Sequence, residues 1–456
     1  MGKYFGTDGF RGEAGVELTS EQAYKIGRFL AWHFGNGGNR VRAVIGKDTR
    51  RSSYMLEYAI ASGLAAGGGD AYMLHVTTTP SVSYATAAGD FSLGIMISAS
   101  HNPYYDNGIK ILNSKGEKLD ENTTELIEAY LDGELEKLGV SGDLPLARGA
   151  EIGEIVDYTE GRNRYIGYLI SLSRRSFKQL RVGLDCANGG AWMIAKSVFD
   201  ALGAKTYTIN ASPNGLNINQ EAGSVHIEHL QRLVRENSLD LGFAFDGDAD
   251  RCICVDEKGE VANGDHILYI LATAMKSEGE LDKNTVVTTV MSNLGLYKAL
   301  DNAGISYEKT AVGDRYVYEK MQECGYTLGG EQSGHIIISK YATTGDGILT
   351  AIKITEAVIE GKTTLSKLKE PVVTLPQVTK SIRVENRHRV KKNPLVTKEA
   401  ENISKELGTG GRIILRESGT EPVLRIMVEA QEQKECYEYI DRMVLAIREA
   451  ERECRI

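Results

Sequence analysis

Hydrophobic and polar positions along the chain follow one pattern that occurs three times. Each occurrence predicts an apolar strand, an amphipathic helix that ends at glycine, and a second strand. The occurrences span residues 41–76, 181–209 and 285–310. β-branched residues fill the predicted strands, which favours buried β structure. Strands that alternate with helices in this way predict α/β domains of related topology.

Each of these units is followed by a further strand that opens with Leu-Gly and runs into a polar loop. Ligands of α/β sheets bind beyond the carboxyl ends of the strands. We therefore expect the three loops to face one cleft. The strands are expected at 93–97, 241–245 and 328–330, and the loops at 98–103, 246–251 and 331–335.

The last part of the chain has a different pattern. Strands are predicted at 377–384, 412–416 and 423–430, and a closing helix at 436–453, which is typical of a smaller α+β domain. The predicted fold class is therefore α/β, with three related α/β domains and a smaller C-terminal α+β domain around a central cleft. The expected domains are 1–150, 151–256, 257–369 and 370–456.

The charge balance narrows the class of ligand. Lys and Arg total 53 against 62 Asp and Glu, which gives a net charge of −9 at pH 7. This balance argues against a nucleic-acid-binding protein, whose affinity depends on neutralising phosphates with basic residues. No apolar run approaches the ~18 residues of a membrane span, and the six cysteines have no disulfide or zinc spacing. We expect a cytoplasmic protein that binds a small molecule, and neither nucleic acid nor membrane.

Asp246, Asp248 and Asp250 place three carboxylates at alternate positions directly after a predicted strand. Carboxylates this close repel one another unless a cation neutralises them, and oxygen ligands suit Mg²⁺ or Ca²⁺. The spacing is also that of an EF-hand loop, but Arg251 stands where that loop requires glycine. A phosphatase with Asp246 as its nucleophile is an alternative interpretation.

Ser100 occupies the equivalent loop of the first unit, directly before His101, Asn102 and Pro103. A loop serine can simply cap a helix, but the match with the acidic loop favours another role. A serine that faces a divalent cation is a candidate phosphoryl carrier, because phosphoryl transfer depends on positioning and on charge stabilisation. Lys110 is a candidate proton shuttle if its surroundings lower its pKa.

Three further loops carry polar groups. Glu331–His335 combines a carboxylate, an amide, a hydroxyl and an imidazole, which suits sugar hydroxyls. Arg416–Pro422, with Arg425 beyond it, offers backbone N–H groups and guanidinium groups, the usual means of holding a phosphate dianion. Gly6–Gly12 is rich in glycine and contains Arg11, but it matches neither the P-loop nor the dinucleotide-binding fingerprint. Nucleotide use is therefore unsupported.

Taken together and in this order, the five motifs resemble those of the α-D-phosphohexomutase superfamily, and the resemblance covers essentially the whole chain. It implies that Ser100 is the serine phosphorylated in the active enzyme. It also implies that the three aspartates bind one Mg²⁺, with phosphorylated Ser100 as a further ligand. The other implied site residues are Arg11, Lys110 and His335 in catalysis, His101, Arg251, Glu331 and Ser333 at the substrate, and Arg416, Ser418, Gly419, Thr420 and Arg425 at its non-reacting phosphate.

Within the superfamily, the chain resembles the branch that acts on glucosamine phosphates. The residues that carry this likeness are Gly6–Gly12, Gly330–His335, Ser418–Pro422 and Cys186–Gly189, followed by Asn214–Asn219. The likeness implies an isomerase that interconverts glucosamine 6-phosphate and glucosamine 1-phosphate and supplies UDP-N-acetylglucosamine and cell-wall precursor synthesis. Glucosamine 1,6-bisphosphate is the implied intermediate and activator. Gly190 departs from the pattern, because Ala often follows Asn-Gly there, and we expect it to lie away from the chemistry.

Three alternatives stay open beside this interpretation. One is a phosphomannomutase or phosphoglucomutase of the same superfamily. The others are the sugar phosphatase with Asp246 as nucleophile and a sugar-phosphate-binding protein without catalytic activity. A homodimer is common in the superfamily and is the assembly that the resemblance implies.

Overall fold

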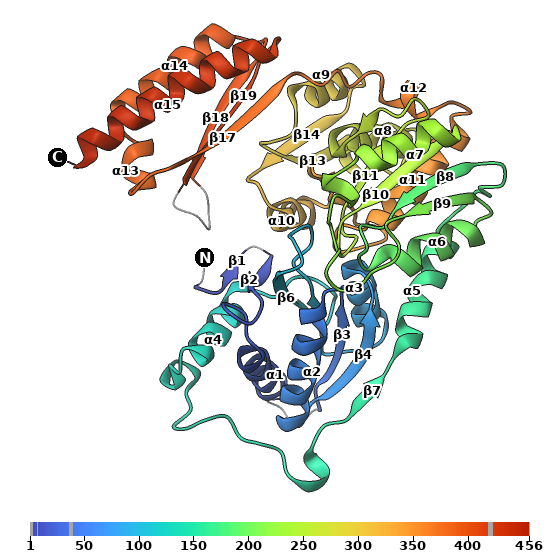
Figure 1. Cartoon of the computed structure of the whole chain (residues 1–456), viewed down its shortest axis with the longest axis vertical. Helices are drawn as coiled ribbons and strands as arrows, with labels where there is room; N and C mark the ends of the chain where they lie inside the picture. The colour runs from blue at the N-terminus through green and yellow to red at the C-terminus, as the bar shows by residue number, and fades with distance from the viewer. Residues whose placement is uncertain (1–2, 7, 36–39, 418–422, 456) are drawn as a thin grey trace. The chain divides into compact units, whose positions relative to one another are not determined.

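The computed structural model describes residues 3–6, 8–35, 40–417 and 423–455, and for 454 and 455 only the backbone (Figure 1). Contacts along the chain divide it into two compact units. The first unit contains Met1–Met291 and Ile305–Glu370, and the second contains Ser292–Gly304 and Pro371–Ile456.

Three sheets form the framework of the first unit, and each belongs to one α/β domain. In the first domain the strand order is β1-β2-β6-β5-β3-β4-β7, and β3, β4, β5 and β7 run parallel. These strands are β1 (Phe5–Gly6), β2 (Gly9–Glu13), β3 (Arg42–Lys47), β4 (Asp70–Val76), β5 (Leu93–Ile97), β6 (Asp106–Asn113) and β7 (Ile155–Asp157). The helices of this part are α1 (Ser20–Gly35), α2 (Arg51–Ala66), α3 (Thr79–Ala88) and α4 (Glu121–Leu131), with short 3-10 turns η1 (Leu135–Leu138) and η2 (Gly149–Glu151).

The second and third domains have smaller sheets with the orders β12-β11-β10-β8-β9 and β14-β13-β15-β16. The strands are β8 (Arg181–Asp185), β9 (Lys205–Ile209), β10 (Leu241–Phe245), β11 (Cys252–Val255), β12 (Val261–Ala262), β13 (Thr285–Thr289), β14 (Ser306–Thr310), β15 (Leu328–Gly330) and β16 (Ile336–Ile338). The helices are α5 (Thr159–Ser171), α6 (Ala191–Ala201), α7 (Glu228–Asn237), α8 (Gly264–Ser277), α10 (Asp314–Cys324), α11 (Gly347–Glu360) and α12 (Leu365–Lys369), with 3-10 turns η3 (Gly223–Val225) and η4 (Asp282–Asn284).

The repeat predicted from the pattern of the chain is present in all three sheets. In each sheet the repeat helix connects two parallel strands in sequence. A further strand then pairs antiparallel with the strand that follows it in the chain. These antiparallel hairpins are β5–β6, β10–β11 and β15–β16. The predicted bounds of β5, β10 and β15 are those observed. The three polar loops therefore occupy the same position in three related sheets.

The second unit contains an antiparallel sheet of order β17-β19-β18, against which α14 and α15 pack (Figure 1). Leu424, Ile426 and Val428 of the central strand contact Ile440, Met443 and Ile447 in a buried core. The elements are β17 (Gln377–Arg383), β18 (Arg412–Glu417), β19 (Val423–Glu429), α9 (Leu294–Asn302), α13 (Arg387–Lys391), α14 (Pro394–Leu407) and α15 (Gln433–Arg455).

The segment Ser292–Gly304 belongs to the second unit, although it lies far earlier in the chain than the rest of that unit. The side chain of Asn293 exchanges two hydrogen bonds of 3.0 Å with the backbone of Leu375. Arg412 forms a two-pronged ion pair with the fully buried Glu429, and also donates to the carbonyl oxygen of Ser292. A buried charge is stable only when it is paired in this way.

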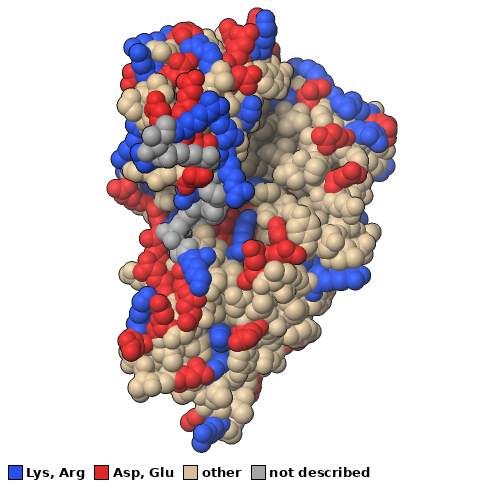
Figure 2. All heavy atoms as spheres, turned by 60° about the vertical axis from the view of Figure 1, so that its left-hand side comes forward, with Lys and Arg blue, Asp and Glu red and all other residues tan. Residues whose placement is uncertain are grey.

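Within the described ranges, no helix combines the length and the apolar character needed to cross a membrane. On the face drawn in Figure 2, acidic and basic side chains are interspersed rather than gathered into a field of one sign.

Asp346 connects two helices of the first unit at a buried position. Its Oδ1 accepts a hydrogen bond of 2.9 Å from the Leu349 N–H at the start of α11. Its Oδ2 accepts one of 2.8 Å from the hydroxyl of Tyr165 on α5. Burial disfavours the carboxylate and raises the pKa of Asp346 to about 6.

We predict that Asp346 makes the folded chain less stable as the pH rises. An unfolded aspartate loses its proton near pH 4, whereas folded Asp346 keeps its proton until about pH 6. The folded state therefore binds more protons between these values, and the stability that the protonated group contributes is lost as the pH rises through that window. The loss is about 1–3 kcal/mol, at about 1.4 kcal/mol for each pKa unit.

The measurement is the thermal midpoint of the wild type and of Asp346→Asn from pH 4.5 to pH 7. The variant should gain on the wild type as the pH rises, because Asn cannot ionise. Asp282→Asn, at an exposed position, is the control and should follow the wild type. A difference between Asp346→Asn and the wild type that does not change with pH would contradict the prediction.

Candidate active site

The three hairpins bring the predicted functional loops into one region of the first unit. Ser100 lies between β5 and β6, the three aspartates between β10 and β11, and Glu331 between β15 and β16. Contacts between these loops cross domain boundaries. Ser100 of the first domain donates to Asp246 of the second, and Asp250 of the second lies 3.7 Å from the imidazole of His335 of the third.

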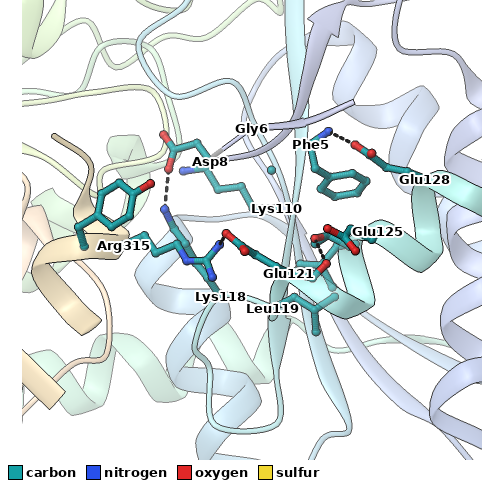
Figure 3. Close-up of a pocket in the computed structure, with 14 residues that line it drawn as sticks. Phe5, Gly6, Asp8, Lys110, Lys118, Leu119, Glu121, Glu125, Glu128 and Arg315 are labelled. Atoms are coloured by element: carbon teal, nitrogen blue, oxygen red, sulfur yellow. Dashed lines mark hydrogen bonds and ion pairs between the residues drawn. The ribbon is translucent and has the colours of Figure 1, made fainter. Parts of the chain in front are cut away.

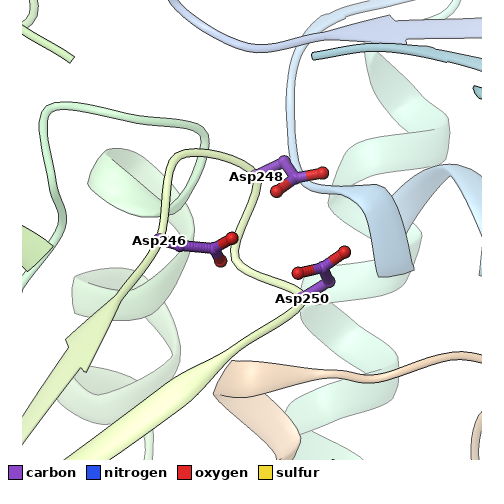
Figure 4. A group of neighbouring side chains, drawn as sticks. All are labelled: Asp246, Asp248 and Asp250. Carbon is purple, nitrogen blue, oxygen red and sulfur yellow. The ribbon is translucent and has the colours of Figure 1, made fainter. Parts of the chain in front are cut away.

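The aspartate loop gathers three carboxylates around one point (Figure 4). One oxygen from each of Asp246, Asp248 and Asp250 lies within 4.8 Å of the others, and all three side chains are buried. Ala249 has a left-handed backbone with φ of 55°, which lets the loop reverse between two of them. Burial, reinforced by the two neighbouring carboxylates, raises the pKa of Asp246 well above its usual value.

These oxygens fit a hard divalent cation. Among the described residues, Oδ1 of Asp248 and Oδ1 of Asp250 are buried and accept no hydrogen bond. Buried carboxylate oxygens normally have a partner, and Mg²⁺ takes oxygen ligands of this kind. The loop thus offers buried carboxylate oxygens that accept no hydrogen bond from the described residues.

Ser100 is 1% exposed and points at this cluster. Its Oγ donates a hydrogen bond of 2.5 Å to Oδ2 of Asp246 and lies 3.3 Å from Nδ1 of His101. Burial and the nearby guanidinium groups of Arg251 and Arg11 lower the pKa of His101 to about 4. His101 is therefore neutral at pH 7, and its Nδ1 can accept from Arg251, whose Nη1 lies 3.2 Å away.

Lys110, on β6, neutralises two of the aspartates. Its Nζ donates to Oδ2 of Asp248 at 2.6 Å and to Oδ2 of Asp250 at 3.0 Å. Burial would lower the pKa of Lys110, but the carboxylates of Asp248, Asp250 and Asp8 outweigh it and raise the pKa. The proton-shuttle hypothesis required a lowered pKa of Lys110, whereas these neighbours raise it.

His335 is buried between the second and third domains. Its Nδ1 lies 3.7 Å from Asp250 and its Nε2 lies 3.4 Å from Asp314, while the Gly345 N–H points at Nε2 over 3.0 Å. Burial lowers the pKa of His335, but the carboxylates around it prevail and raise it to about 9.

A row of alternating charges continues from His335 to the N-terminal loop. Lys118 donates to Asp314 at 2.7 Å and to Asp8 at 2.6 Å, and Asp8 accepts from Arg11 at 2.8 Å. This row borders a pocket between β1, α4 and α10, in which Arg315 pairs with Glu121 at 3.1 Å (Figure 3). Arg11 is thereby linked to His335 through Asp8, Lys118 and Asp314.

Glu331 and Ser333 lie at the third loop as predicted. Oε1 of Glu331 accepts from the Gly313 N–H at 3.1 Å, and the Ser333 hydroxyl lies 3.5 Å from Oε2. Burial raises the pKa of Glu331. Ser333 is exposed, so a ligand can reach its hydroxyl.

The expected phosphate loop of the fourth domain is described only at its ends. Arg416 and Arg425 are direct partners in the register of β18 and β19. Ser418, Gly419 and Thr420 lie outside the described residues. Guanidinium groups are donors of the kind that hold phosphate groups.

The departure at Gly190 lies closer to the chemistry than expected. Its N–H donates to the carbonyl oxygen of Gly247, inside the aspartate loop, at 2.8 Å. A Cβ at Gly190 would lie 2.1 Å from the carbonyl oxygen of Thr77, which no real side chain tolerates. Glycine is thus required here by close packing of the first domain on the second.

The sequence analysis assigned no role in the site to several residues that the structure places there. Lys118 and Asp314 are joined only by folding, and Arg50 and Asn219 contact the backbone of the serine loop. A signal was available for Arg50, since it follows β3 in the same strand-end position as the other polar loops. Asn219 lay in a motif that was used only to compare branches.

Family models match most of the chain. Models described as phosphoglucomutase/phosphomannomutase α/β/α domains I, II and III match residues 2–137, 163–259 and 263–374, and the model of the C-terminal domain matches 380–446. The four-domain fold predicted from the sequence is thereby confirmed.

Solved structures of this family have the same fold. A phosphoglucomutase/phosphomannomutase family protein from Burkholderia thailandensis has a TM-score of 0.80 at 22% identity, with 97% of each chain covered. An Aspergillus fumigatus N-acetylphosphoglucosamine mutase, solved with GlcNAc-6P and magnesium, has a TM-score of 0.72 at 18% identity, with 98% of this chain and 96% of that chain covered.

Sequence relatives are much closer. The phosphoglucosamine mutase of Lachnospira eligens is 61% identical over 450 residues, which cover 98% of this chain and 99% of that protein. The phosphoglucosamine mutase of Lachnoclostridium phytofermentans is 56% identical over 449 residues, with the same coverage. The chain therefore belongs to the phosphoglucomutase/phosphomannomutase family, and within it to the phosphoglucosamine mutases, which are isomerases.

Proposed function

We propose that this chain interconverts glucosamine 6-phosphate and glucosamine 1-phosphate, and that the phosphoryl group passes through Ser100. The observation that carries the proposal is the 2.5 Å contact between Oγ of Ser100 and Asp246, at the edge of the aspartate cluster. A serine oxygen at a site built for a divalent cation is where a phosphoryl group can be carried and transferred. The names of the close relatives supply the sugar.

The reaction divides into two transfers that mirror each other. In the first, the bond between phosphorus and Oγ of Ser100 breaks, and a bond forms between phosphorus and the free hydroxyl oxygen of the sugar. The sugar then carries two phosphates, as glucosamine 1,6-bisphosphate, and turns end over end. In the second, Oγ of Ser100 takes the other phosphoryl group, which leaves the isomeric monophosphate. The same bisphosphate, supplied from outside, would activate an unphosphorylated chain.

Proton transfer accompanies each step. In the first transfer the sugar hydroxyl loses a proton and the departing oxygen of Ser100 gains one, and in the second transfer the hydroxyl of Ser100 loses its proton and the departing sugar oxygen gains one. Lys110 and His335 are the proposed acid and base groups, since both face the aspartates. Despite burial, neighbouring carboxylates raise the pKa of both, so each begins with the proton that it would donate as the acid. Mg²⁺ held by Asp246, Asp248 and Asp250 would act as a Lewis acid that stabilises charge on the transferring phosphoryl group.

The remaining residues bind and orient the sugar phosphate in this proposal. Glu331 and Ser333 contact sugar hydroxyls, and Arg11, His101 and Arg251 line the reacting end. Arg416 and Arg425, with Ser418, Gly419 and Thr420, hold the phosphate that does not react. Because either end of the sugar must fit this second position, a fixed phosphate site suits the turn of the intermediate.

A competition assay decides between the sugars. Phosphorus NMR follows glucosamine 6-phosphate, glucose 1-phosphate and mannose 1-phosphate together with Mg²⁺ and a trace of hexose 1,6-bisphosphate. Preference for the glucosamine phosphate supports the proposal, and preference for glucose or mannose moves the chain to the neighbouring branch. Release of free phosphate alone would identify the phosphatase, with Asp246 as nucleophile.

We also propose that the enzyme is cytoplasmic and forms a homodimer, as the resemblance implies. Light scattering of the eluting protein during gel filtration measures the mass directly. The monomer mass is 49.9 kDa, so a peak near that value would exclude a stable dimer at the concentration used.

We predict that Ser100→Ala abolishes turnover and leaves the fold intact. Loss of a covalent nucleophile costs roughly 10⁴-fold or more in rate. The measurement pairs activity in the bisphosphate-primed assay with intact mass, which reports the phosphorylated protein. Ser197→Ala, on the exposed side of α6, is the control and should keep both activity and the added phosphate. Undiminished turnover by Ser100→Ala would defeat the assignment.

We predict that Asp248→Asn weakens the response to Mg²⁺. The substitution keeps the size of the side chain but removes the charge, and even loss of an outer-sphere partner costs about 10–100-fold in metal affinity. The Mg²⁺ concentration for half-maximal activity should therefore rise more than about 100-fold. Asp282→Asn, on an exposed turn, should leave the titration unchanged. An unshifted titration of Asp248→Asn would count against its role as a ligand.

A further inference from the structure

The backbone of the serine loop is held from two sides. The carbonyl oxygens of Ser100 and Asn102 each accept a hydrogen bond from Arg50 and another from Asn219. The distances from Nη2 of Arg50 are 3.3 and 2.6 Å, and those from Nδ2 of Asn219 are 2.8 and 2.9 Å. We call this arrangement the carbonyl clamp. Arg50 belongs to the first domain and Asn219 to the second, so the clamp joins two domains.

Arg50 is itself fixed. Its side chain is fully buried, and its guanidinium forms an ion pair with the buried carboxylate of Asp48. Its Nη1 also lies 3.4 Å from Oγ of Ser98, which accepts a hydrogen bond of 3.0 Å from the Ser100 N–H. Arg50 thus reaches both ends of the Ser100 backbone, and the pairing with Asp48 offsets part of the cost of burying its charge.

Asn219 is the part of the clamp that comes from the second domain. It is 7% exposed, and its own backbone N–H donates to the carbonyl oxygen of Ala187 at 2.9 Å. Its φ of 57° lies in the left-handed region, where Asn is among the better-tolerated residues. Its amide is therefore presented to the serine loop by a rigid backbone.

The aspartate loop packs directly against the clamp. A Cβ at Gly247 would lie 2.5 Å from the carbonyl oxygen of Ser100 and 3.1 Å from Nδ2 of Asn219. With no side chain at Gly247, the backbone between Asp246 and Asp248 lies immediately beside the carbonyl oxygen that Asn219 holds. A shift of that carbonyl would therefore change the separation between Oγ of Ser100 and the aspartates.

Ser100 needs such support because of its backbone. Its φ of 52° lies in the left-handed region, which is unfavourable for a non-glycine residue and persists only where the surroundings hold it. Four hydrogen bonds to the two carbonyl oxygens around the loop supply that restraint. A displacement of about 1 Å at a reacting group can cost about 100-fold in rate.

We propose that Asn219 is a positioning residue for phosphoryl transfer. Through the carbonyl oxygens of Ser100 and Asn102, and together with Arg50, it holds Oγ of Ser100 against the aspartate cluster. The proposal rests on the role of Ser100 given under the proposed function. In this proposal the second domain supplies the aspartates and also positions the serine of the first domain.

The test compares Asn219→Asp and Asn219→Ala with the wild type. Asp keeps the size of the side chain and tolerates the left-handed backbone, but it turns an amide donor into an acceptor that faces two carbonyl oxygens. Asn219→Ala removes the donor without adding charge. If Asn219→Asp fails to fold, Asn219→Ala tests the positioning role on its own. The control is Asn214→Asp in the same loop, which is exposed and keeps its accepted hydrogen bond from Leu216.

Three quantities are measured for each protein: kcat and KM for glucosamine 6-phosphate, the fraction phosphorylated at Ser100 by mass spectrometry, and the thermal midpoint. The positioning role predicts a fall in kcat of about 10- to 100-fold, with KM changed less than about twofold and slower phosphorylation by the bisphosphate. The control should match the wild type in all three.

Two results would overturn the inference. One is a wild-type kcat and phosphorylation rate in both Asn219 variants. The other is a loss of activity that tracks the fraction unfolded and disappears at lower temperature, which would mean a purely structural contact. Failure of the proposed function looks different, because the wild type itself would then carry no phosphate on Ser100.

Discussion

Repulsion among three buried carboxylates is the constraint around which the first unit is built. Two like charges about 4 Å apart repel by about 4 kcal/mol at an effective dielectric constant of about 20, and one oxygen from each of Asp246, Asp248 and Asp250 lies within 4.8 Å of the others. In addition to burial, this repulsion contributes to the raised pKa of Asp246. Each domain answers with a cationic or titratable group, namely Lys110 from the first, Arg251 from the second and His335 from the third. Groups from all three domains therefore meet at the charge cluster.

Most of the fold was readable from local pattern, because each repeat is a short-range signal. The three strands before the polar loops were predicted at their observed bounds. The pattern did not fix where the first repeat helix begins. It begins at Arg51, after a turn in which Asp48 accepts hydrogen bonds from the Arg50 N–H and the Ser53 hydroxyl. Hydrophobic periodicity does not reveal such side-chain hydrogen bonds.

The same distinction between local pattern and long-range contact applies to the site residues. Ser100 and the aspartates were found because each motif is contiguous and sits at an equivalent strand end. Lys118 and Asp314 are 196 residues apart, and nothing near either of them signals the ion pair. The expectation that Gly190 lies away from the chemistry was wrong for a related reason. Its requirement comes from the carbonyl oxygen of Thr77 in another domain, and a single chain does not display which backbones will touch.

The discontinuous second unit has a consequence for dissecting the molecule. A fragment that starts at Pro371 would omit Ser292–Gly304, and with it the Asn293 side chain that satisfies the Leu375 backbone and the Leu294 N–H that donates to Glu429 at 3.2 Å. The segment Pro371–Ile456 is thus not by itself a unit that can be exchanged between relatives. A chimaera that exchanges this domain between relatives must also transplant the short segment between β13 and β14, or leave buried polar groups of the exchanged part without their partners.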